Sequence, residues 1–80
     1  MTGDKLAAVL EDLGFLVRPD VHTSHGFFVR WPDGSPLGFY QLAPDGAYRA
    51  GWVESKYSTC RIDCPDWPTF YDRITKATQR

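Results

Sequence analysis

The sequence predicts an α+β fold. An N-terminal helix, an antiparallel β-meander of 4–5 strands and a C-terminal helix form two layers, with both helices on one face of the sheet. Three observations predict it. Helical spacing of apolar residues occurs near the two ends of the chain, β-type runs fill the middle, and the connections between those runs are too short for anything but antiparallel neighbours. We expect one domain over residues 1–80, because eighty residues support one core.

The first helix is expected over residues 3–13, where apolar residues form one stripe. Thr2 can cap its start, and Gly14 is a natural left-handed terminator. Phe15 is then placed to fold back on the last turn of the helix. The stripe consists of Leu6, Val9, Leu10 and Leu13.

The sheet is expected from residue 15 to residue 62. A short strand over 15–18 precedes the runs HGFFVRW, PLGFYQLA, AYRAGWVE and YSTCRI. Asp33-Gly34 and Asp45-Gly46 separate the first three of these runs, and Asp-Gly is a strong hairpin signal. We treat both pairs as two-residue loops, which sets the register of the meander.

The C-terminal helix is expected from the segment FYDRITKATQR, in which Phe70, Ile74 and Ala77 lie on one side. Pro68 suits the first helical turn, since its missing N–H costs nothing there. Trp67 precedes a proline, so we expect it just outside the helix.

Strand alternation then assigns each side chain to one side of the sheet. One side is the expected wall for the helices, and it contains Phe27, Val29, Trp31, Tyr40, Leu42, Val53, Cys60 and Ile62. The other side is expected to stay open, and it contains Phe28, Arg30, Leu37, Phe39, Gln41, Tyr48, Trp52, Glu54, Tyr57, Thr59 and Arg61.

The open side is the candidate functional surface, because aromatic residues make up 15% of the chain. A core this small cannot enclose every ring, so some rings should face solvent for a reason. Large rings interleaved with Arg and Gln are typical of protein interfaces. The predicted partner-binding residues are Phe28, Arg30, Phe39, Gln41, Tyr48, Trp52, Glu54, Tyr57 and Arg61. Two alternatives are a half-barrel that buries both sides of the sheet and a homodimer through the open side.

The stretch TCRIDCPDWPTF contains the two cysteines, Cys60 and Cys64. Four extended residues span about 13 Å, well beyond the roughly 7 Å limit between the Cα atoms of a disulfide. We therefore interpret Cys60 as a small core residue and Cys64 as a thiol at the end of a strand. His22 and His25 could join them on zinc, but this spacing matches no strong zinc pattern. No metal and no cofactor are expected.

No catalytic residue is predicted. Gly34 and Gly46 are turn glycines rather than a phosphate-binding loop, and the sequence has no Gly-x-Ser-x-Gly elbow. Asp63 and Asp66 could pose as an acid/base pair, but loop and cap aspartates are far more common. We therefore expect a protein that is not an enzyme.

The formal net charge of −1 offers no general attraction to nucleic acid or to anionic membranes. Single-stranded nucleic acid stacking on the open sheet remains the alternative function, although the sequence lacks the basic stripe typical of such domains. The N-terminal segment is too acidic and broken for a signal peptide, and no run reaches the length of a membrane span. We expect a cytoplasmic protein.

In size and architecture the chain resembles the small single-domain inhibitors encoded by phages, anti-CRISPR proteins in particular. Those proteins are typically α+β, cytoplasmic and poor in motifs, and many occlude a surface of the CRISPR effector complex. The resemblance implies an inhibitor whose partner is a CRISPR effector subunit. It covers the format of the whole chain, and no functional residue is carried over from it.

Overall fold

The computed structural model describes residues 3–54 and 61–78 of the chain. The fold consists of two helices and a five-stranded sheet. The helices are α1 (Gly3–Asp12) and α2 (Trp67–Thr78). The strands are β1 (Leu16–Pro19), β2 (Gly26–Arg30), β3 (Pro36–Leu42), β4 (Tyr48–Glu54) and β5 (Arg61–Cys64).

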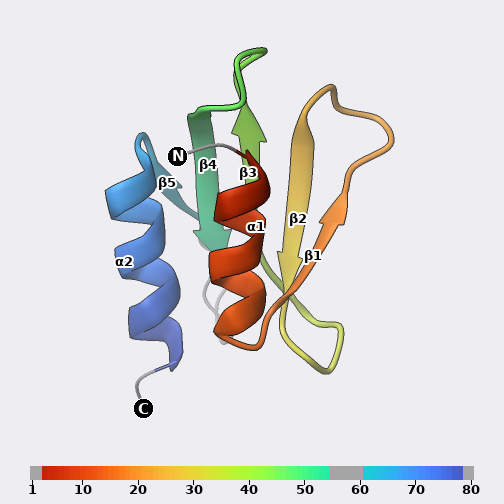
Figure 1. Cartoon of the computed structure of the whole chain (residues 1–80). Helices are drawn as coiled ribbons and strands as arrows, with labels where there is room; N and C mark the ends of the chain where they lie inside the picture. Colours follow the sequence, from red (N-terminus) through yellow and green to blue (C-terminus); the bar gives the residue numbers. More distant parts are fainter. Residues whose placement is uncertain (1–2, 55–60, 79–80) are drawn as a thin grey trace.

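The strands lie in the sheet in the order in which they occur in the sequence, and every neighbouring pair is antiparallel. Figure 1 shows the two helices side by side on the same face of this sheet. The α+β prediction is therefore confirmed, including the placement of both helices in one layer. None of the helices in the described part of the chain is long and apolar enough to cross a membrane.

Helix α1 ends as the sequence predicts. Gly14 adopts a left-handed conformation with φ of 97°. Its N–H donates to the carbonyl of Glu11, and the N–H of Phe15 donates to that of Leu10, at 2.9 and 3.2 Å. This pair of bonds is a Schellman motif, which satisfies carbonyls that the end of the helix would leave unpaired. It also turns Phe15 back into the core beside Leu10.

Helix α2 begins one step earlier than expected. Asp66 is its N-cap, because one of its carboxylate oxygens accepts the backbone N–H of Thr69 at 2.9 Å. Trp67 is the first helical residue rather than a residue outside the helix. A residue that precedes a proline disfavours the helical conformation. At Trp67 this preference is outweighed by the N-cap and by the packing of the Trp67 ring against the core.

The two Asp-Gly turns are three-residue loops, not two-residue loops. Trp31 and Ser35 are hydrogen-bonded across Pro-Asp-Gly, and so are Ala43 and Ala47 across the second Pro-Asp-Gly. The glycine of each loop has φ near 90°, the left-handed position that follows a type I turn in such hairpins. Each loop is therefore one residue longer than predicted.

A β-bulge next to each loop compensates for this extra residue. The register shifts between Val29 and Arg30, opposite Leu37, and again between Gln41 and Leu42, opposite Arg49. The central pairs, such as Phe28 with Phe39, keep the predicted register.

Leu37 and Tyr48 lie at these bulges, so the prediction placed them on the wrong side of the sheet. Both were assigned to the open side. Leu37 is buried in the core, and the ring of Tyr48 packs against that core. A bulge reverses the alternation of the residues on its far side, and strand parity alone cannot show this.

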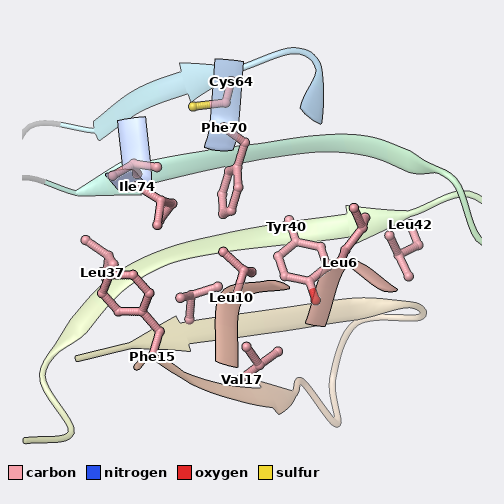
Figure 2. Packing of buried hydrophobic residues seen from close by; sticks show 12 residues of the cluster. Leu6, Leu10, Phe15, Val17, Leu37, Tyr40, Leu42, Cys64, Phe70 and Ile74 are labelled. Atoms are coloured by element: carbon pink, nitrogen blue, oxygen red, sulfur yellow. The ribbon is translucent and has the colours of Figure 1, made fainter. Parts of the chain in front are cut away.

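The core lies between the helices and the sheet, and Figure 2 shows its buried side chains. Tyr40 on β3 reaches into this core and is fully buried. Its ring contacts those of Phe27, Tyr48 and Phe70 with centroids 5.3 to 6.3 Å apart. Cys64, expected only as a thiol at the end of a strand, is a buried core residue.

Four further residues on and before β5 had been assigned to a side of the sheet. Ile62 was expected under the helices, and its register position opposite Val53 agrees, yet 38% of its surface is exposed. Its position on the outermost strand explains this exposure, since β5 has no neighbour beyond it. The predictions for Tyr57, Thr59 and Cys60 lie outside the described residues.

Candidate binding face

The side of the sheet that faces away from the helices carries one row of side chains across all five strands. In the register of the sheet, Arg18 is opposite Phe28, Phe28 opposite Phe39, Phe39 opposite Trp52, and Trp52 opposite Asp63. Because side chains opposite one another in adjacent strands point to the same side, three rings lie between an arginine and an aspartate.

The three rings contact one another without joining the core. The centroids of Phe28 and Phe39 are 5.2 Å apart, and those of Phe39 and Trp52 are 5.9 Å apart in a stacked arrangement. All three side chains are half-buried, and none belongs to the core cluster or packs against it. Phe39 also covers Gly26, where an added Cβ would lie 2.8 Å from its ring. We call Phe28, Phe39 and Trp52 with their flanking polar residues the aromatic face.

Two arginines lie over these rings. The guanidinium carbon of Arg30 is 5.6 Å from the centroid of Phe28, and that of Arg61 is 4.1 Å from the centroid of Trp52. Arg61 also forms an ion pair with Glu54 at 3.6 Å. Exposed cation–π contacts contribute about 0.5–1 kcal/mol and exposed ion pairs still less, so these contacts orient the side chains more than they stabilise the fold.

A hollow of about 340 Å³ opens beside Trp52 on β3, β4 and β5. Ala50 helps to explain it, because its small side chain lies on the same side of β4 as the large ring of Trp52 and leaves the space beside that ring unfilled. The volume is at the lower end of the range for small-ligand sites. The hollow is lined by Phe39, Gln41, Ala50, Gly51, Trp52, Asp63, Cys64 and Pro65.

Two polar side chains border this hollow. The side-chain amide of Gln41 donates to the carbonyl of Ser24 at 3.1 Å, which anchors it to the loop before β2. Asp63 is exposed, and within residues 3–54 and 61–78 it has neither an ion pair nor a hydrogen bond. The aromatic face therefore presents an unpaired carboxylate directly beside an indole.

The shifted pKa values belong to the core and to the caps. Burial raises the pKa of Tyr40 to about 12 and also raises those of Tyr48 and Cys64. The Tyr48 hydroxyl donates to the carbonyl of Cys64 at 2.6 Å. The hydrogen bond with the side chain of Thr69 lowers the pKa of Asp66, and the bond with that of Thr23 lowers the pKa of Asp20.

The structure brings together most of the predicted binding residues. These are Phe28, Arg30, Phe39, Gln41, Trp52, Glu54 and Arg61. Tyr48 is the exception, since its ring packs on Tyr40 and Phe70 under the helices, and Tyr57 lies outside the described residues. Sequence reasoning missed Arg18 and Asp63 as members of the face. Their membership follows from the cross-strand register of β1 and β5. The sequence did not determine where these two short strands pair with their neighbours.

A metal site finds no support in the described part of the chain, where no three His, Cys, Asp or Glu side chains form a cluster. His25, one of the two histidines considered as ligands, is in the loop before β2 with φ of 59°. Cys64 is buried in the core on the opposite border of the sheet.

The comparisons with known proteins identify no relative. No protein-family model matches the chain, and neither a curated protein nor a solved structure is similar to it. The comparisons therefore add nothing to the inference of function.

Proposed function

We propose that this chain is a small non-catalytic binding module of the cytoplasm, which occludes a surface of another protein through its aromatic face. One observation carries the proposal: the neighbouring rings of Phe28, Phe39 and Trp52 are only half-buried, on the side that neither α1 nor α2 covers. A domain of eighty residues has little apolar surface to spare, so three adjacent rings outside the core call for a function.

The chemistry of the face suits a protein partner. Trp and Arg are the residues most enriched among those that dominate binding energy, and Arg61 stacked on Trp52 presents both at once. Arg30 and Glu54 lie at either end of the rings as a polar border. An apolar centre with a polar rim is the usual anatomy of a protein interface.

The class of partner follows from the resemblance in size and architecture to anti-CRISPR proteins. On this proposal the face covers a surface of a CRISPR effector subunit, and the chain acts as an inhibitor. The direct test is cleavage of target DNA by purified effector complexes with and without an excess of the chain. Loss of cleavage that is restored by Trp52→Ala would support this class of partner, whereas unchanged cleavage across effector types would remove it.

Binding of single-stranded nucleic acid is the second candidate, because bases stack on rows of exposed rings and three arginines lie in or beside this row. Those arginines are Arg18, Arg30 and Arg61. Two carboxylates oppose it: Asp63 ends the row, and Glu54 already pairs with Arg61. Both would repel a phosphate backbone. Fluorescence anisotropy with labelled oligonucleotides at low and moderate salt tests this candidate.

The experiment for the main proposal compares two aromatic-to-alanine variants. Trp52→Ala removes a half-buried ring of the aromatic face, and Tyr71→Ala removes a ring on α2 that is 37% exposed, in the other layer. Each protein is used to capture partners from host-cell extract. The captured protein is then purified, and its affinity for each variant is measured by titration calorimetry.

Trp52→Ala is expected to weaken binding by about 2 kcal/mol or more, while Tyr71→Ala leaves it unchanged. Equal affinity of Trp52→Ala and the native chain would refute the proposal. Sedimentation velocity on the same proteins decides whether the partner is a second copy. In that case the native chain forms dimers that Trp52→Ala dissociates.

A further inference from the structure

The structure repeats one chemical arrangement on both sides of Trp52, and only one of the two is complete. On one side, Arg61 lies 4.1 Å over the indole and pairs with the carboxylate of Glu54. A cation is thus held between an aromatic ring and an acid, which is a favourable place for it. This place is filled by the chain's own side chain.

On the other side, Asp63 lies directly opposite Trp52 in the sheet, and the hollow opens beside them. The indole and the carboxylate are again neighbours. Here, however, Asp63 has no cation among the described residues, as noted above, and Ala50 leaves the space for one empty of side chain. The second place has a ring, an acid and a hollow of about 340 Å³.

We propose that this hollow is the subsite for an arginine or lysine side chain of the partner protein, with its charge on Asp63 and its stem along Trp52 and Phe39. This inference rests on the proposed function and names the chemical group that the face recognises. The long apolar stem of a basic side chain matches apolar walls, and its charged head matches a carboxylate at the rim. Gln41 lies on the opposite wall and provides a polar contact for the head group.

The charges on the rest of the face agree with such a selective subsite. Arg18, Arg30 and Arg61 would repel a uniformly basic surface, whereas the only unpaired carboxylate of the row is at the hollow. A partner that fits therefore offers acidic groups to Arg18 and Arg30 and one basic side chain to Asp63. Such alternation gives specificity, because a wrong partner meets like charges.

The test uses NMR titration of the isotope-labelled full chain with three capped tripeptides, Gly-Arg-Gly, Gly-citrulline-Gly and Gly-Glu-Gly. Citrulline has the shape of arginine without its charge. With the arginine peptide we expect shifts at the Trp52 indole N–H, at the Gln41 side-chain amide and at residues 50, 51 and 63. Binding of the citrulline peptide should be about fivefold weaker or more, and the glutamate peptide should leave these signals unmoved.

Two variants complete the test. Asp63→Asn removes the carboxylate and is expected to reduce binding of the arginine peptide to the level of the citrulline peptide. Asp72→Asn makes the same change of charge on α2, where Asp72 pairs with Lys76, and should leave binding unchanged. Asp63 is exposed and unpaired, so the asparagine variant is expected to fold like the native chain.

The inference is overturned if the citrulline peptide binds as tightly as the arginine peptide, if Asp63→Asn has no effect, or if none of the peptides binds. It is also overturned if Asp63→Asn strengthens binding of a single-stranded oligonucleotide while the arginine peptide stays unbound. Failure of the inference is distinguishable from failure of the proposed function. In the first case Trp52→Ala still weakens binding of the protein partner and Asp63→Asn does not, whereas in the second Trp52→Ala has no effect on that partner.

Discussion

The two sides of one sheet use aromatic rings in different ways. Under the helices, the ring of Phe70 contacts those of Tyr40, Tyr48 and Trp67 from three directions, with centroids 5.6 to 5.8 Å apart. On the aromatic face, among the residues that the structure describes, the ring of Phe39 contacts only the rings in its own row, Phe28 and Trp52. The rings around Phe70 are enclosed between the sheet and the helices, whereas the rings of the aromatic face have no second layer over them among the described residues.

Ring contacts alone therefore do not make a core. Both sets have centroid separations of five to six ångströms, yet only the rings under the helices are enclosed by a second layer. The free energy gained by burying a ring depends on the area removed from water. Rings in a single row cover only one another's edges and faces, so part of their area stays in contact with water. On the proposed function, the area of the aromatic face that remains exposed is the area that a partner would bury.

Truncation of one ring on each side is the strongest way to break this comparison. Phe70→Ala should lower the free energy of unfolding by about 3–5 kcal/mol, because it leaves a cavity in the closed set. Trp52→Ala should cost only about 1 kcal/mol. Urea unfolding followed by circular dichroism measures both, and Phe70→Leu serves if the alanine variant does not fold. Equal losses for the two rings would contradict the distinction between core and binding face.

A substitution at Gly51 tests how closely β4 approaches β3 and the side chain of Tyr48. A Cβ at this position would lie 2.5 Å from the carbonyl oxygen of Phe39 and 2.6 Å from the hydroxyl of Tyr48. Gly51→Ala should therefore cost about 2 kcal/mol, because backbone and core must both shift. The double variant with Tyr48→Phe removes one obstacle and should recover part of the loss. If Gly51→Ala left the free energy of unfolding unchanged, β4 would not approach β3 and Tyr48 as closely as the structure shows.

Alkaline pH probes the buried side selectively. Burial raises the pKa of Tyr40 to about 12 from an ordinary value of 10.0, so the hydroxyl ionises in the unfolded chain first. Stability should thus be fully present below pH 10 and fall as the pH rises toward 12, by about 1.4 kcal/mol per pH unit for each such tyrosine. Urea midpoints at pH 9, 10 and 11 measure the slope. Tyr40→Phe should reduce this slope, and an unchanged slope would contradict the assignment.

Two buried hydroxyls sharpen the comparison within the core. The hydroxyl of Tyr48 donates to the carbonyl of Cys64, whereas that of Tyr40 has no partner in the described part of the chain. Tyr48→Phe should cost about 1 kcal/mol, and Tyr40→Phe should be neutral or stabilise by up to about 1 kcal/mol. Thermal unfolding of the two single variants separates them. A loss of stability in Tyr40→Phe would mean that its hydroxyl has a partner.

Much of the fold could be predicted from local patterns. The helical stripe that ends at Gly14 predicted α1 and its Schellman motif, because both depend on neighbouring residues. The pair Phe28 and Phe39 was predicted to share the open side, and the structure confirms this. The prediction succeeded although each loop is one residue longer than assumed, since each bulge cancels its loop.

The candidate site was predictable only in its central rings. Arg18 and Asp63 join the row through β1 and β5, which are short edge strands with weak sequence signals. The hollow beside Trp52 depends on Ala50, whose small side chain lies among larger residues of three strands. No stretch of sequence by itself contains that arrangement.

The sequence by itself determined the order of the elements, the antiparallel meander and the presence of more rings than one side of the sheet can bury. These features follow from periodicity, turn residues and composition, which act over a few residues at a time. Tertiary packing was needed to show that Tyr48 turns inward, that Leu37 is buried and that Asp63 lies opposite Trp52 with no ion pair or hydrogen bond to another described residue. Bulges and cross-strand neighbours depend on how distant segments pack, and an Asp-Gly pair is compatible with more than one loop length.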